Sequence, residues 1–194
     1  MNIPGITWKG ESIEDVEILR ELPADLVRVL SDTNGFVIHE GALHVRGACL
    51  TPEWHSLRVA LRGTAAFHTL YKDVRPADIP FAQDQVGDQF LIREGVVLRL
   101  SAETGEIEHL ADSLPDFFSK VCSDIEGFVN VGLGHRMQPG QLLHAYPPFC
   151  IRESGAGASL EALPASEVIL FHADFAKRIR NLPDGTKVRF TLID

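Results

Sequence analysis

The sequence has no long apolar run, few cysteines and little positive charge, and each absence narrows the class of protein. No segment approaches the roughly 18 to 20 consecutive apolar residues that a transmembrane helix needs, so we expect no membrane span. The first ten residues, MNIPGITWKG, lack the basic and apolar regions of a secretory signal, and we expect none. These features favour a cytoplasmic protein.

Cysteine occurs at only three positions, Cys49, Cys122 and Cys150. The number is odd, and no two of these residues have the CxxC spacing of a redox or zinc site. Such a set argues against a disulfide framework and favours a reducing compartment. We expect all three thiols to be buried as small apolar side chains.

Positive charge is scarce, since 18 Lys and Arg stand against 27 Asp and Glu, for a net charge of −9. Residues 1–128 hold 21 acidic and 11 basic residues, a balance of −10, whereas residues 129–194 hold 6 and 7, a balance of +1. An acidic surface repels phosphates, so we expect no nucleic-acid binding. It would instead steer a basic protein partner towards residues 1–128, although the same charge also serves simply to keep a protein soluble.

Motifs for catalysis, metals and cofactors are missing. The eight histidines form no HExxH or HxH pattern and have no cysteine at ligand spacing. The nucleophile elbow GxSxG is absent, and residues 155–159, GAGAS, lack the lysine of a phosphate-binding loop. We therefore assign no catalytic residue, no metal site and no cofactor.

Helix signals come first along the chain. Ser12, with Asp15 three residues later, predicts a first helix start. Pro23 suits the first turn of a second helix, which the pair Asn34-Gly35 ends.

Short strands and a third helix are expected next. Residues 36–47 predict two strands around a turn at Glu40-Gly41. Thr51 as cap and Pro52 at the first helical position predict a helix that follows directly.

The clearest strand pattern covers residues 88–110, where two turns separate three alternating segments. We expect a three-stranded antiparallel meander with one packed and one solvated face. The apolar residues expected on the packed face are Phe90, Ile92, Val96, Leu98, Leu100 and Ile107.

A helix that covers this face is predicted to follow, with Asp112 or Ser113 as its cap and Gly127 at its end. Its apolar stripe is Leu114, Phe117, Phe118, Val121, Cys122 and Ile125.

The tail from residue 129 changes character and is rich in glycine and proline. We expect short strands and loops, then a helix capped by Ser166, and a closing strand at residues 186–193. The apolar stripe of that helix is Val168, Phe171, Phe175 and Ile179.

Taken together, the elements predict a single α+β domain over residues 1–194. Its core, residues 12–128, is a twisted antiparallel β-meander flanked by helices. Residues 129–194 form a C-terminal α/β extension packed on that core.

Residues 78–90, DIPFAQDQVGDQF, concentrate polar side chains between two apolar stretches. Asp84 can accept backbone N–H groups in an Asx turn, Gly87 can take a positive φ, and Asp88 can hold the first meander strand in place. We interpret the stretch as a structural loop whose frame is Pro80, Phe81, Gly87 and Phe90.

A binding role for the same loop is an alternative. Its polar rim, which would contact a partner or small ligand, is Gln83, Asp84, Gln85 and Asp88. Catalysis by Asp84 and Asp88, as in a hydrolase, is a further alternative, because paired carboxylates can act as general acid and base.

The order of these motifs along the chain resembles the SUKH superfamily, which includes yeast cell-wall-assembly and killer-toxin-resistance regulators and many bacterial relatives. The resemblance spans roughly residues 20–125. The positions that carry it are Leu22, Pro23, Asn34, Gly35, Pro80, Phe81, Ala82, Asp84, Gly87, Asp88, Phe90, Phe117 and Phe118. The chain departs from the family pattern at Phe36, where a second glycine is common, and in the tail beyond residue 129.

The resemblance implies a non-enzymatic protein-binding module with a SUKH-like α+β fold. Many bacterial members are thought to be immunity proteins that neutralise toxin domains, and the yeast members are regulators that work through protein contacts. The expected partner is therefore a protein, such as a basic toxin domain, whose cleft the acidic part of this chain would cover.

Overall fold

The computed structural model describes residues 3–129, 136–183 and 185–188, and in it seven strands form one antiparallel sheet in the order of the sequence. Each strand pairs with the next one along the chain, so the predicted meander of three strands is the second half of a larger one. The strands are β1 (Ile6–Lys9), β2 (Phe36–Ile38), β3 (Leu43–Val45), β4 (Ile79–Asp84), β5 (Gln89–Arg93), β6 (Val96–Leu100) and β7 (Ile107–Ala111).

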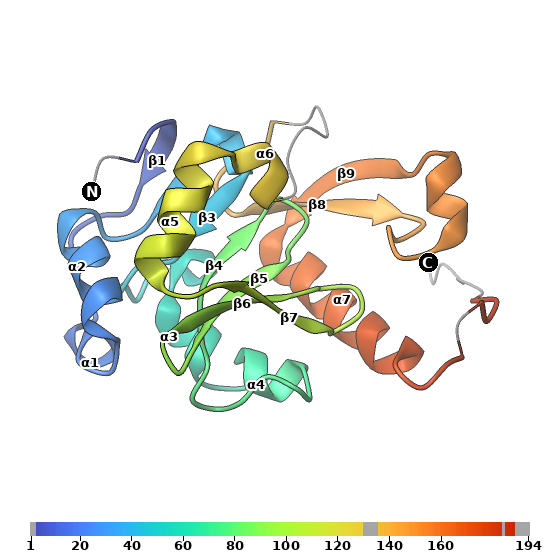
Figure 1. Ribbon diagram of the computed structural model, residues 1–194, viewed down its shortest axis with the longest axis horizontal. Coiled ribbons are helices and arrows are strands. Elements are labelled where there is room, and N and C mark those ends of the chain that lie inside the picture. The colour runs from blue at the N-terminus through green and yellow to red at the C-terminus, as the bar shows by residue number, and fades with distance from the viewer. Residues whose placement is uncertain (1–2, 130–135, 184, 189–194) are drawn as a thin grey trace.

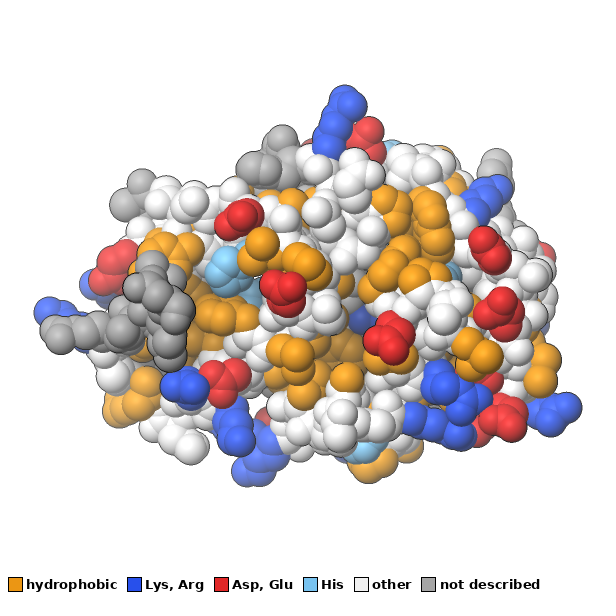
Figure 2. Space-filling view, turned by 180° about the vertical axis from the view of Figure 1, so that it is seen from behind, with side chains coloured by type: hydrophobic (Ala, Val, Ile, Leu, Met, Phe, Trp, Pro, Cys, Tyr) orange, Lys and Arg blue, Asp and Glu red, His pale blue; other side chains and the backbone are white. Residues whose placement is uncertain are grey.

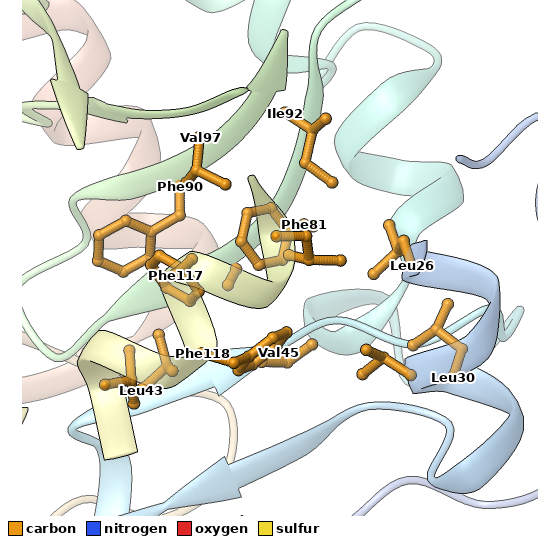
Figure 3. Packing of buried hydrophobic residues seen from close by; sticks show 14 of the residues in the cluster. Leu26, Leu30, Leu43, Val45, Phe81, Phe90, Ile92, Val97, Phe117 and Phe118 are labelled. Carbon is orange, nitrogen blue, oxygen red and sulfur yellow. The ribbon is translucent and has the colours of Figure 1, made fainter. Parts of the chain in front are cut away.

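Helices α2 (Ala24–Asp32) and α5 (Leu114–Ser123) cover one face of the sheet, which we call the front face (Figure 1). The hydroxyl of Ser113 accepts the N–H of Asp116, which caps α5 as expected. Phe81 and Phe90 from the sheet meet Phe117 from α5, with ring centroids 5.3 and 5.1 Å apart (Figure 3). This apolar layer is the main core of the molecule.

The opposite, rear face is also covered, which corrects the prediction of a solvated side. Helices α3 (Leu57–Leu61), α4 (Phe67–Leu70) and α7 (Ala165–Ile179) lie along it. Leu91 pairs with Leu98 and packs on this rear face, whereas Phe90 and Ile92 face the front. The residues that we expected beside Phe90 but that lie on the rear are Val96, Leu98, Leu100 and Ile107.

The C-terminal part forms a two-stranded hairpin, β8 (Gln141–Tyr146) and β9 (Ser159–Pro164), followed by α7. Figure 1 shows the hairpin and α7 beside the end of the sheet opposite to β1 and α2. Pro164, not Ser166, occupies the N-cap position of α7. Phe171 is 37% exposed instead of buried in the helix stripe. The expected closing strand lies mostly outside the described residues, and residues 186–188 are not in a strand.

Two helix starts differ from their predictions. The first helix, α1 (Val16–Leu19), begins after Asp15, whose carboxylate accepts the N–H of Ile18 and thus takes the capping role expected of Ser12. The segment after Thr51 forms a 3-10 turn, η2 (Glu53–His55), before α3 begins. The remaining short elements are η1 (His39–Gly41), α6 (Ile125–Phe128) and η3 (Arg152–Ala156).

The cysteines correct a further prediction, because only Cys49 is buried and Cys122 and Cys150 are exposed. Cys122 lies on the outward side of α5 and not in its apolar stripe. Within the described part of the chain, no helix is long and apolar enough to cross a bilayer.

Candidate functional site

The loop between β4 and β5 is a hydrogen-bonded turn built around Asp84. One carboxylate oxygen, Oδ1, accepts the N–H groups of Val86 and Asp88 at 3.1 and 3.0 Å. The backbone closes the same turn, since the N–H of Asp84 donates to the carbonyl of Asp88 at 3.1 Å. Gly87 has a φ of +92°, the positive value that its position in the turn requires. Asp88 in turn accepts the N–H of Ala102 at 2.8 Å, which ties the loop to the segment after β6.

The proposed polar rim of this loop lies largely inside the protein. The side chains of Gln83, Asp84 and Gln85 are at most 4% exposed, and only Asp88 is partly accessible. The C-terminal extension covers the loop, because Leu143 of β8 donates its N–H to the carbonyl of Gln85 at 2.7 Å. A partner protein could therefore reach Asp88 but not the other three side chains. The hydrogen-bond partners of these three residues lie within the loop itself, on Arg46 and on β8.

The rear face carries a buried cation that sequence reasoning missed. Arg46 follows β3 and is only 3% exposed. Its Nη1 donates to the carbonyl of Pro80 at 3.0 Å, and its Nη2 donates to the Oε1 atoms of Gln83 and Gln89 at 2.5 and 2.8 Å. The guanidinium carbon also lies 5.2 Å from the ring centroid of Phe67, in cation–π range.

Charge balance at Arg46 is unusual. Among the residues that the structure describes, no carboxylate forms an ion pair with it, and its three acceptors are neutral. Burial lowers the pKa of Arg46 to about 9, which leaves the guanidinium protonated at pH 7. A buried charge is normally paired, because its removal from water costs several kcal/mol. Arg46 is therefore the buried group on this face whose charge the fold leaves without a counterion.

A pair of buried histidines lies next to Arg46. His44 on β3 and His55 in η2 are joined by a 2.8 Å hydrogen bond between Nε2 of His44 and Nδ1 of His55. Nε2 of His55 is 2.9 Å from the carbonyl of Asn34. A carbonyl can only accept, so Nε2 of His55 donates to it and Nδ1 accepts the proton that His44 donates.

Both histidines are neutral at pH 7. Burial lowers the pKa of His55 to about 4. Burial, together with the neighbouring His55 and Arg46, holds the pKa of His44 well below its usual value.

The glycines around His55 explain the Asn34-Gly35 motif. A Cβ atom at Gly35 would lie 2.3 Å from Cε1 of His55, and one at Gly47 would lie 2.5 Å from its Nε2. The side chain of Asn34 bridges the same region, with Oδ1 accepting the N–H of Ala48 at 2.7 Å. The motif thus ends α2 and also makes room for the buried imidazole.

The histidine pair and Arg46 form a polar cluster at the centre of the rear face. Its members come from β3, β4, β5 and η2: His44, Arg46, His55, Gln83 and Gln89. The cluster holds one fixed positive charge and two neutral imidazoles, so its chemistry suits the binding of an anion better than proton transfer to bulk water. The described residues contain no group of three side chains placed to hold a metal ion.

The only sequence signal for this cluster is the strand LHVR, in which a histidine and an arginine alternate with two apolar residues. In the fold, Leu43 and Val45 face the front core and His44 and Arg46 face the rear.

Comparison of the chain with protein-family models, curated proteins and solved structures finds no match in any of the three.

Proposed function

We propose that this chain is a non-enzymatic protein-binding module of the immunity type, which neutralises a basic toxin domain by covering it. The observation that carries the proposal is an acidic surface with apolar residues at its centre. It consists of the exposed residues Glu11, Ser12, Glu14, Val16, Glu17 and Leu50, and we call it the N-terminal acidic surface. Val16 and Leu50 are large apolar side chains that are 51% and 54% exposed.

Two distant segments meet to form this surface. The N–H groups of Glu14 and Asp15 both donate to the carbonyl of Ala48, at 3.1 and 3.0 Å. This contact holds Leu50 beside Glu14, whose Oε2 atom is 3.5 Å from the N–H of Leu50. The apolar side chains therefore lie among carboxylates in the part of the chain that carries the acidic excess.

The carboxylates in this segment differ in how far they are neutralised. The buried Asp15 and the exposed Glu17 pair with Arg58, at 2.5 and 2.9 Å. Among the described residues, Glu11 and Glu14 form no ion pair and are exposed. Exposed apolar side chains with a charged rim are typical of protein interfaces, and unpaired negative charge speeds the approach of a basic partner.

Two further observations support a binding role without catalysis. The motifs of the chain resemble the SUKH superfamily, whose bacterial members are thought to include immunity proteins and whose yeast members act as regulators through protein contacts. Asp84, the residue on which a hydrolase mechanism would depend, is fully buried and accepts two backbone N–H groups. A carboxylate used in this way is poorly placed to accept a proton from a substrate.

The first test is capture of partners by the tagged protein from the lysate of its own cells, in low and high salt, with identification by mass spectrometry. We expect one basic protein that is lost at high salt, because screening weakens attraction between exposed charges. That protein is then purified, and its toxicity is compared with and without co-production of this chain. A partner whose toxicity is unaffected would contradict the immunity role.

The second test assigns the surface. Glu11→Lys with Glu14→Lys should slow association with the purified partner by roughly tenfold at low salt. The matched control, Asp112→Lys with Glu126→Lys, changes the same charge on exposed residues near α5 and α6 and should have a much smaller effect. Equal effects of the two double variants would show that only net charge matters, and the N-terminal acidic surface would not be the interface.

A further inference from the structure

A small pocket opens on the rear face beside Arg46. It has a volume of about 130 Å³ and lies between the segment that holds η2, α3 and α4 and the first turns of α7. Figure 2 shows this side of the molecule, where hydrophobic side chains gather around hollows near its centre. The apolar side chains that line the pocket include Trp54, Val59, Ala60, Phe67, Leu70 and Ile169.

Arg46 supplies a positive charge to this apolar wall. Its guanidinium has five N–H donors, and the described residues provide three hydrogen bonds to it, all from neutral oxygens. The ring of Phe67, which also lines the pocket, lies against the guanidinium. A buried cation with donors to spare is best matched by a singly charged anion, which would replace the lost solvation.

The start of α7 adds a second feature that favours negative charge. Ala165 and Ser166, the first two residues of this 15-residue helix, line the same pocket. The N-cap residue is Pro164, whose side chain has no acceptor for the N–H groups of the first turn, and the N–H of Ala165 donates to the carbonyl of Gly140 at 2.8 Å. The positive end of the helix dipole therefore lies at the pocket, on the side opposite to α3 and α4.

We propose that this pocket binds a small monocarboxylic acid with an apolar body, the carboxylate on Arg46 and the body between Phe67 and Ile169. The pocket is slightly smaller than the enclosed cavity of about 150 Å³ that accommodates benzene, but it is open at the surface, so part of a ligand the size of benzoate can extend outwards. The apolar lining disfavours phosphate and sulfate, which need polar contacts on every oxygen. Glu53, which also lines the pocket, disfavours a second negative charge on the ligand. This site is separate from the N-terminal acidic surface, and neither proposal depends on the other.

The test uses the full-length protein with benzoate as the probe. We expect benzoate to bind in a calorimetric titration and to shift the amide resonances of residues 65–70 and 165–170. Benzamide has the same shape without the charge and should bind at least about tenfold more weakly. Acetate has the charge without the ring and should also bind at least about tenfold more weakly. Inorganic phosphate should not compete.

Two variants connect binding to the pocket. Arg46→Met should weaken benzoate binding by at least about tenfold, whereas the control Arg75→Met, at an exposed arginine paired with Glu94, should leave it unchanged. Ala65 lines the pocket but is exposed, so Ala65→Trp should fill the opening without disturbing the core and should also abolish binding. This second variant keeps the test open if Arg46→Met does not fold.

Several results would overturn the proposal. Benzoate that shifts no resonance of the pocket at about 10 mM, or that binds equally well to Ala65→Trp, would show that the pocket is not its site. Equal binding of benzamide would remove the role of Arg46. Competition by phosphate would make the site a general anion site, which is a different proposal.

Discussion

The two faces of the seven-stranded sheet are both covered by helices, but they are built from different chemistry. The front face meets α2 and α5 through an apolar layer in which Phe81, Phe90 and Phe117 pack ring against ring. The rear face meets α3, α4 and α7 through a smaller apolar cluster that is interrupted by Arg46 and the histidine pair. One face therefore resembles an ordinary core, and the other has charged and polar groups at its centre.

This difference separates stability from function. An apolar layer stabilises the fold by burial alone, whereas a buried polar cluster stabilises it little and requires every group to be satisfied. We expect substitutions on the front face to change mainly the free energy of unfolding. Substitutions of Arg46 on the rear should cost less stability and should also change what the protein binds.

The largest effect is expected in the front core. Phe117 is fully buried and contacts the rings of Phe81, Phe90 and Phe118. Phe117→Ala should reduce the free energy of unfolding by about 3 to 5 kcal/mol, because it removes apolar contacts and leaves a cavity. Urea denaturation followed by circular dichroism measures this change. A loss below about 1 kcal/mol would show that the front layer is not the main core.

The second prediction concerns pH and the rear face. The pKa of His55 is about 4 in the folded protein and near 6.5 in the unfolded chain. Between these values the unfolded chain binds a proton that the folded protein does not, so stability is full above pH 6.5 and falls as the pH falls to 4. His55 alone should account for up to about 3 kcal/mol of this loss. His172, whose pKa burial and the nearby His144 also lower to about 4, adds to it in the same window.

Unfolding by urea at several pH values from 7 down to 4 measures the slope. His55→Gln removes the titrating group and should flatten the curve relative to the wild type. Its own cost at pH 7 does not affect this comparison, which depends only on the difference in slope. If the free energy of unfolding of the two proteins depends on pH in the same way, His55 binds its proton as readily in the folded protein as in the unfolded chain, which would contradict the prediction.

A smaller effect is expected at the turn that joins β4 to β5. Asp84→Ala removes the acceptor of the N–H groups of Val86 and Asp88 and should cost about 2 to 3 kcal/mol. Asp84→Asn keeps an oxygen in the same place and should cost clearly less. Thermal unfolding of the two variants provides the comparison. Equal losses would indicate that the negative charge of Asp84, and not its hydrogen-bond geometry, holds the turn.

The smallest effect concerns the reactivity of the thiols. Cys122 lies on the outer side of α5, and Cys150 lies in the C-terminal extension. Although Cys150 is exposed as a residue, its thiol is partly buried, and this burial, followed by the nearby Glu103, raises the pKa of Cys150 to about 12, so little thiolate forms at neutral pH. Burial also raises the pKa of Cys49, to about 11. We therefore expect brief alkylation, followed by mass spectrometry, to label the exposed Cys122 first. Cys122→Ser should change stability by less than about 0.5 kcal/mol. Faster labelling of Cys150 would contradict its assignment beside Glu103.

Local sequence patterns predicted the strands β5 to β7, the helix α5 that follows them and the turn that precedes them. The three meander strands, the helix capped by Ser113 and the turn at Asp84 all depend on residues close together in the sequence. Their hydrogen bonds span only a few residues or join neighbouring strands. Such features can be read from periodicity and turn chemistry without knowledge of the rest of the chain.

The assignment of side chains to faces failed for a physical reason. The strands β5 and β6 are buried on both sides, so both sets of alternating residues include apolar side chains, such as Phe90 on the front and Leu91 on the rear. Alternation then no longer indicates which residues share a face. The register of strand pairing decides which side chains share a face. Leu98 pairs with Leu91 on the rear, so β6 is shifted by one residue from the prediction that Leu98 lies on the same face as Phe90.

The polar cluster on the rear face could not be predicted, because its contacts join residues that are distant in the sequence. Arg46 reaches Pro80, Gln83 and Gln89, which follow it by 34, 37 and 43 residues. A lone arginine after a short strand gives no sign that it is buried. The pocket itself requires α7, which follows Arg46 by more than a hundred residues and covers it only in the folded state.

The most direct test of this account is the free energy of unfolding of Arg46→Met, measured beside the wild type with and without benzoate. Without benzoate, we expect Arg46→Met to lose about 1 to 3 kcal/mol, because it removes the donors to Pro80, Gln83 and Gln89 while it relieves the cost of an unpaired buried cation. With benzoate at about 100 times its Kd, the wild type should gain about 2 to 3 kcal/mol and Arg46→Met should gain almost nothing. A loss of more than about 3 kcal/mol in Arg46→Met without benzoate, with no gain in the wild type when it is added, would show that Arg46 serves the fold and would contradict the account.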